Sequence, residues 1–126
     1  MTARVLRFIL GGSLAFMAPE ALAGERNAAT DLYALGVTAA WALCRTHPLV
    51  NDPHDRGQLL DALAKQSPAR ALLREKLPEP CRDAILALLS AEPSARGTAR
   101  TLLARLARDA GVWLTAAQRA RAASAD

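Results

Sequence analysis

The stretch from Leu32 to Cys44 constrains the fold most, because almost every residue in it is apolar or small. A helix that is apolar on all sides belongs inside a domain or a membrane. This stretch is too short to cross a bilayer as a helix. We therefore expect a buried central helix, with Thr30 as its N-terminal cap and Asp31 as a favourable charge in its first turn.

Ordinary amphipathic helices are expected after this stretch. Prolines at His47-Pro48 and Asn51-Asp52-Pro53 mark a loop that ends the central helix. Apolar residues at helical spacing then predict a helix behind an Asp55 cap that ends at Ser67-Pro68, a short piece around residues 71–73, and a helix from about Pro80 to Ala91. Because no stretch alternates apolar and polar residues, strands are not expected and the predicted fold is all-α with a buried central helix.

The last predicted helix starts at a Thr98 cap and stops at Gly111. One face of it carries only apolar residues, namely Ala99, Leu102, Leu103, Leu106 and Ala110. We expect that face to pack on the rest of the domain. Residues 111–126 are expected to be a C-terminal tail, with a short helix between Thr115 and Ala123 and disorder at the end.

Composition limits the chain to one compact domain and excludes several kinds of site. With 126 residues, of which 52% are hydrophobic, there is material for a single core. The net charge of +4 comes from arginines spread along the chain without interleaved aromatic residues, so neither nucleic acid nor a membrane is expected as a partner. Cys44 and Cys81 lie too far apart in sequence for a metal-ligand motif, so no metal is expected, and a disulfide between them stays open.

The amino terminus allows a second interpretation. A basic start from Met1 to Arg7, an apolar stretch from Phe8 to Met17 and the small residues Ala21-Leu22-Ala23 follow the plan of a secretory signal peptide. Residues 1–23 would then be removed from a small secreted helical protein. Against this, residues 11–13 interrupt the apolar run, and Pro19-Glu20 places a charge just before the cleavage site.

Three motifs, in order, carry a resemblance to a known family. They are the segment Gly12 to Glu20, which ends in Ala-Pro-Glu, the segment Asp31 to Val37, and the segment Ala91 to Arg96, which ends in Glu-Pro-Ser-Ala-Arg. Together they resemble the C-terminal lobe of protein kinases, from the end of the activation segment onward, in the bacterial-type serine/threonine group. The resemblance covers roughly residues 11 to 110, so residues 1–110 are expected to be a partial protein kinase domain.

The resemblance implies roles for individual residues. Glu20 would form a structural ion pair with Arg96, which ties the substrate loop to the helical core. Asp31 would anchor the central helix, and in the family it also holds the catalytic loop. The substrate-binding residues would be Gly12, Ser13, Leu14 and Phe16, with Phe16 in the place of the usual tyrosine.

The sequence also departs from the family. Trp41 stands where many members have a glutamate, and we expect it to be a packing residue. Arg45 replaces the glycine that usually ends the central helix. No glycine-rich loop, paired lysine, catalytic loop or Asp-Phe-Gly motif occurs between Met1 and Asp126, so no catalytic residue is assigned.

Three hypotheses about function follow. The first is a truncated cytoplasmic serine/threonine kinase domain, whose intact family uses ATP and Mg²⁺ but which is inactive alone. The second is a stand-alone lobe that binds a protein substrate or the missing N-terminal lobe of a kinase. The third is the secreted helical protein.

Overall fold

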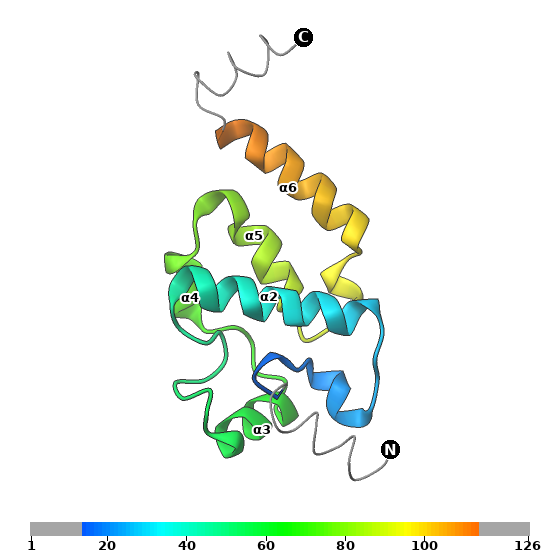
Figure 1. Cartoon of the computed structure of the whole chain (residues 1–126), viewed down its shortest axis with the longest axis vertical. Helices are drawn as coiled ribbons and strands as arrows, with labels where there is room; N and C mark the ends of the chain where they lie inside the picture. Colours follow the sequence, from blue (N-terminus) through cyan, green and yellow to red (C-terminus); the bar gives the residue numbers. More distant parts are fainter. Residues whose placement is uncertain (1–13, 114–126) are drawn as a thin grey trace.

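The computed structural model describes the backbone of residues 14–113 and the side chains of residues 14–108. The described chain is all-α and contains no strand. Its elements in order are the 3₁₀ turns η2 (Leu14–Phe16) and η3 (Pro19–Ala23), the helices α2 (Ala28–Cys44), α3 (Arg56–Ala64), α4 (Ala71–Lys76) and α5 (Glu79–Leu88), the 3₁₀ turn η4 (Pro93–Arg96) and the helix α6 (Ala99–Trp113). Figure 1 shows α2 crossing the middle of the molecule, with α3 on one side and α5 on the other.

The central helix starts earlier than the sequence predicts. Its N-terminal cap is Asn27 and not Thr30, because the Asn27 side chain accepts a hydrogen bond from the Thr30 backbone N–H at 3.1 Å. The Thr30 hydroxyl in turn accepts from the Asn27 N–H at 3.0 Å. This reciprocal capping box satisfies two backbone donors that would otherwise lack partners. Asp31 lies in the first turn, as expected.

Helix α2 is the buried central helix that the sequence predicts, but one side of it is exposed. Tyr33, Val37 and Ala40 are at most 1% exposed, whereas Leu35 is 48% and Leu43 is 50% exposed. The helix ends at Arg45, which adopts a left-handed conformation with φ 57° and donates its N–H to the Trp41 carbonyl. Glycine is the residue that this conformation favours, and the kinase resemblance expects glycine at this position.

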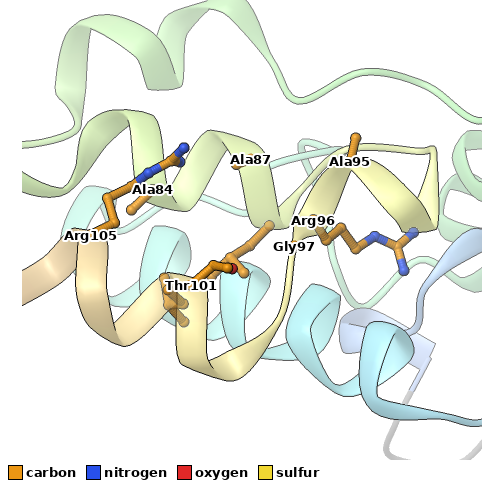
Figure 2. Close-up of a pocket in the computed structure, with 9 residues that line it drawn as sticks. Ala84, Ala87, Ala95, Arg96, Gly97, Thr101 and Arg105 are labelled. Carbon is orange, nitrogen blue, oxygen red and sulfur yellow. The ribbon is translucent and has the colours of Figure 1, made fainter.

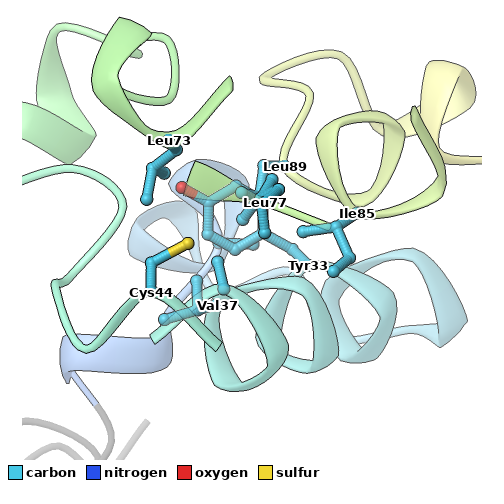
Figure 3. Close-up of a cluster of buried hydrophobic side chains, with 9 residues drawn as sticks. Tyr33, Val37, Cys44, Leu73, Leu77, Ile85 and Leu89 are labelled. Carbon is cyan, nitrogen blue, oxygen red and sulfur yellow. The ribbon is translucent and has the colours of Figure 1, made fainter. Parts of the chain in front are cut away.

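Two clusters of buried apolar residues form the core. The larger one joins α2 to α4 and α5, and Figure 3 shows Tyr33, Val37 and Cys44 of α2 together with Leu73, Leu77, Ile85 and Leu89. The smaller one joins η2 to α3 and to the loop before it, through Leu14, Met17, Val50, Leu59, Ala62 and Leu63. The two clusters hold the segment 14–23 on the opposite side of α2 from α5 (Figure 1).

Gly36 permits the close packing of α2 on α5. A Cβ atom added at Gly36 would lie 2.8 Å from the Leu88 Cβ and 3.2 Å from a Leu89 methyl. Separations below 3.0 Å do not occur between real side chains without movement of one of them. A side chain at this position would therefore push the two helices apart.

The shorter helices follow the predicted order with shifted ends. Asp55 caps α3 as expected, since its carboxylate accepts from the Gln58 N–H at 3.2 Å. Helix α5 ends at Leu88, before the predicted end at Ala91. Cys44 is buried, Cys81 is half-buried, and both are free thiols.

Helix α6 corrects two expectations. Its backbone passes through Gly111 and continues to Trp113, so Gly111 does not end it. Its apolar face is only partly covered, because Leu103 is 69% and Leu106 is 36% exposed. Figure 1 shows α6 running beside α5, with its C-terminal end projecting beyond the other helices. The predicted tail helix from Thr115 to Ala123 lies outside the described residues.

Candidate functional site

Glu20 and Arg96 form the ion pair that the kinase resemblance implies. The Nη1 atom of Arg96 donates to Oε1 of Glu20, and its Nη2 atom donates to Oε2 at 2.9 Å. The Arg96 side chain is 0% exposed and the Glu20 side chain is 12% exposed. Two parallel hydrogen bonds between a guanidinium and a carboxylate fix both the distance and the orientation of the pair. The pair therefore joins the turn η3, which contains Glu20, to the turn η4, which contains Arg96.

The remaining donors of Arg96 bind the backbone of two other segments. Nη1 also donates to the Ala29 carbonyl at 2.9 Å, in the first turn of α2, and Nε donates to the Ser90 carbonyl at 2.9 Å, just after α5. The guanidinium carbon lies 4.9 Å from the centre of the Tyr33 ring. Arg96 thus connects η3, α2, α5 and η4, which explains why a charged residue is tolerated at this depth.

The ionisation of the neighbouring groups agrees with this geometry. Burial acts to raise the pKa of Glu20, but hydrogen bonds from Arg96 and from the Glu20 backbone, together with the positive charge of Arg96, outweigh it. The pKa of Glu20 therefore lies below its ordinary value of 4.5. Burial strongly raises the pKa of Tyr33, whose hydroxyl is buried without a hydrogen-bond partner.

A pocket opens between the segment 16–21 and the start of α2. Its volume is about 230 Å³. Its apolar lining comes from Phe16, Met17, Ala18, Ala21 and Ala34, and its polar lining comes from Arg26, Thr30 and Asp31. Arg26 and Asp31 are exposed and Thr30 is buried, so charges of both signs border an apolar interior. We call it the Phe16 pocket.

The sequence-predicted site residues separate in the structure. Phe16 and Asp31 line the Phe16 pocket. Leu14 is not among the residues that line it, because its side chain is 4% exposed and packs in the smaller core cluster. Gly12 and Ser13 lie outside the described residues.

Sequence reasoning missed His47, which contacts the backbone of Ala15, the residue before Phe16 of the pocket lining. Its Nε2 atom lies 2.6 Å from the Ala15 carbonyl oxygen, and its Nδ1 atom accepts from the backbone N–H groups of Leu49 at 3.1 Å and Val50 at 3.4 Å. The Trp41 ring packs between the rings of His47 and Phe16, at centroid distances of 5.2 Å and 5.5 Å. No motif in the sequence marks this histidine, since its partners are backbone groups.

A smaller cavity of about 70 Å³ lies between α5 and the start of α6. Figure 2 shows its lining by Ala84, Ala87 and Thr101, with Arg105 at one end. The Arg96 side chain extends away from Thr101 and Arg105, so its charge does not face this space (Figure 2). The cavity is about the size needed for a few waters and carries no reactive group.

Within residues 14–108, no three histidine, cysteine or acidic side chains come together in a way that could hold a metal ion. None of the described helices combines the length and apolar character needed to cross a membrane. No protein-family model and no curated protein sequence matches this chain.

Proposed function

We propose that this chain forms the helical, substrate-facing lobe of a protein kinase-type domain, and that it binds a protein segment without transferring phosphate by itself. The observation that supports this most is the two-fold hydrogen-bonded pair of Glu20 and Arg96. These residues are 76 positions apart, and each ends one of the motifs that resemble the kinase family. Glu20 and Arg96 pair with the geometry that the resemblance requires of them.

The Phe16 pocket is the proposed binding site. Five of its lining residues are apolar, so it suits an apolar side chain of an extended peptide, and its volume is large enough for one such side chain. Arg26 and Asp31 at the border would bind backbone or side-chain groups on either side of it. The kinase resemblance places the residue next to a phosphorylated serine or threonine at this position.

The chain itself supplies no means of phosphoryl transfer. That reaction needs a nucleotide site, metal ligands and a residue that orients the hydroxyl, and the sequence between Met1 and Asp126 contains none of the motifs that provide them. ATP and Mg²⁺ would be bound by other parts of a complete domain. Asp31 here acts as a favourable charge at the start of α2 and as a wall of the pocket.

Peptide titration of the ¹⁵N-labelled chain tests this function. Two serine peptides that differ only in the residue after serine, leucine in one and aspartate in the other, are added separately. We expect the leucine peptide to shift the amide signals of Phe16, Met17 and Ala34, and Mg²⁺ with ATP to shift none of them. Equal effects of the two peptides, or shifts confined to α6, would contradict a substrate pocket.

A second candidate function rests on the exposed side of α2. Leu35 and Leu43 are each about half exposed, and exposed apolar surface marks interaction sites when it is continuous. The lobe would then bind the N-terminal lobe of a kinase or compete with an intact kinase for a partner. Co-purification with a kinase N-terminal lobe that Leu35→Lys abolishes would support this candidate, and failure of the two to associate would oppose it.

The alternative hypothesis of a secreted protein can be tested by a direct measurement. Cleavage after Ala23 would remove Leu14 and Ala18 from the core and would leave the buried Arg96 without its carboxylate. The mass of the natural product distinguishes the two forms. An amino terminus at Gly24 would contradict the proposed function, since it removes Phe16.

A further inference from the structure

His47 is buried and holds together two segments that are distant in sequence. His47 is 2% exposed and is one of the few buried polar residues in the described part of the chain. It lies in the loop that follows α2. Through Nε2 it contacts the Ala15 carbonyl, in the turn η2 that leads into the Phe16 pocket. Through Nδ1 it accepts two backbone hydrogen bonds from its own loop.

These contacts fix the protonation state of the ring. Because Nδ1 accepts from the N–H groups of Leu49 and Val50, it carries no hydrogen, and the hydrogen of the neutral ring must be on Nε2, where it is donated to Ala15. Adding a second proton at Nδ1 would place an N–H group against two other N–H groups. The protonated ring keeps its Nε2–H donor to Ala15 but loses both loop contacts, so the loop would have to move away from the ring.

The surroundings of the ring also disfavour a positive charge. Burial lowers the pKa of His47 below its ordinary value of 6.5, the hydrogen bond to Ala15 partly offsets this, and the charge of Arg70 adds to the lowering. Arg70, the residue before α4, binds the same loop as His47. Its side chain donates to the Val50 carbonyl at 3.4 Å, and its backbone N–H donates to the Pro48 carbonyl at 2.8 Å.

The other elements around the ring supply no compensating negative charge. The turn η2 contains only Leu14, Ala15 and Phe16, and α2 contributes the Trp41 ring. Cys44, one turn further along α2, interacts with Lys76 and Cys81 instead. Within residues 14–108, no carboxylate hydrogen-bonds to His47 or forms an ion pair with it.

We propose that neutral His47 is a latch that joins the Ala15–Phe16 segment to the loop at Leu49 and Val50, and that its protonation breaks the loop side of the latch. Because Val50 packs with Leu14 and Met17 in the smaller core cluster, this release shifts the segment and so deforms the Phe16 pocket. The release is local, because the larger core cluster of α2, α4 and α5 does not include His47. The Trp41 ring, which packs between His47 and Phe16, reports the change. The latch is a property of the fold and does not depend on the kinase-type function.

Two measurements on the full chain test the latch together. Long-range ¹H–¹⁵N NMR of the histidine rings gives the tautomer and titration of His47, and Trp41 fluorescence in a Trp113→Phe background gives the movement of the segment. We expect the Nε2–H tautomer at pH 7.5. On acidification, ring protonation and the Trp41 change should have the same midpoint, below pH 6.5, while the far-UV circular dichroism of the helices is retained.

Variants separate His47 from other groups. His47→Gln keeps a donor for Ala15 without a titrating ring, and His47→Asn keeps an acceptor for the Leu49 N–H. Both should lose the Trp41 transition, and His54→Gln, at the other, exposed histidine, should keep it unchanged. If the His47 variants do not fold, the wild-type tautomer and the shared midpoint decide.

Three results would overturn the proposal. One is an Nδ1–H tautomer at pH 7.5, which is incompatible with the two backbone donors. Another is a Trp41 transition that persists in a folded His47→Gln variant. The third is loss of helical circular dichroism at the same midpoint, which would make the acid response a global unfolding.

Discussion

The Arg96 guanidinium is fully buried, and its only charged partner among the described side chains is Glu20, which is 12% exposed. All three guanidinium nitrogens donate hydrogen bonds, to Glu20 and to the carbonyls of Ala29 and Ser90. A charge buried to this extent is stable only while its partner and its hydrogen bonds remain. The position of the segment that contains Glu20 relative to α2 and α5 therefore depends on this pair.

Replacing the guanidinium of Arg96, which makes two parallel hydrogen bonds to Glu20, should destabilise the protein strongly. Arg96→Lys keeps the charge but cannot make two parallel bonds to Glu20, so we expect a loss of about 1.5 to 3 kcal/mol in the free energy of unfolding. Urea denaturation measures it, with Arg100→Lys on exposed α6 as a control that should change by less than about 0.5 kcal/mol. A loss below about 1 kcal/mol for Arg96→Lys would show that the pair is not buried.

Gly36→Ala should destabilise the protein although alanine is the better helix former. The added methyl would lie 2.8 Å from the Leu88 Cβ, and overpacking of this kind costs about 1 to 3 kcal/mol, more than the gain of about 1 kcal/mol in helix propensity. Gly57→Ala in α3 is the matched control, because its methyl meets only the flexible Asp55 carboxylate. If Gly36→Ala were as stable as Gly57→Ala in urea denaturation, α2 and α5 would not pack this closely.

Tyr33→Phe should leave stability unchanged or raise it. The Tyr33 hydroxyl is buried without a hydrogen-bond partner, and an unsatisfied buried polar group costs about 1 to 3 kcal/mol. Phenylalanine removes this group and keeps the ring beneath Arg96. Thermal denaturation followed by circular dichroism should give an equal or higher Tm, whereas a loss of more than about 1 kcal/mol would reveal a bound partner for the hydroxyl.

Stability should fall with acid in two steps. The pKa of His47 is lowered by folding, so the unfolded chain binds the proton first, and the stabilisation from neutral His47 is lost as pH falls below about 6.5. The pKa of Glu20 is also lowered, so its contribution is present above its ordinary pKa of 4.5 and is lost below that value. Urea midpoints between pH 8 and 3 measure both steps. His47→Gln should remove the first step and Glu20→Gln the second, and a profile that is flat from pH 7 to 5 would contradict the buried neutral histidine.

Local sequence signals predicted the helices well and their surfaces less well. The apolar run after Asp31, the prolines after Cys44 and the Asp55 cap each determine local structure, so the order of helices and the all-α fold could be predicted. The start of α2 was misplaced because Thr30 and Asn27 are both good caps, and the capping box uses both of them. The exposure of Leu35, Leu43 and Leu103 could not be predicted, because periodicity does not reveal whether a partner covers a helix face.

In the candidate site, only the contact between residues of two sequence motifs could be predicted. The Glu20–Arg96 pair followed from a family resemblance, and neither residue alone would have indicated it. His47 binds backbone groups of Ala15, Leu49 and Val50, whose positions depend on the tertiary fold. Leu14 was expected at the site but packs in the smaller core cluster instead. Which side chains of the turn η2 face the pocket and which face the core depends on how the turn packs against α3.

The affinity of pocket-filling variants for the leucine peptide tests the central claim most directly. Ala34→Leu adds bulk inside the Phe16 pocket, and Ala42→Leu adds the same bulk to an exposed position of α2 that is not among the residues lining the pocket. We predict that Ala34→Leu raises the Kd for the peptide at least tenfold, about 1.4 kcal/mol, while Ala42→Leu leaves it unchanged. Equal affinities for the two variants would contradict the assignment of this chain as a substrate-binding lobe.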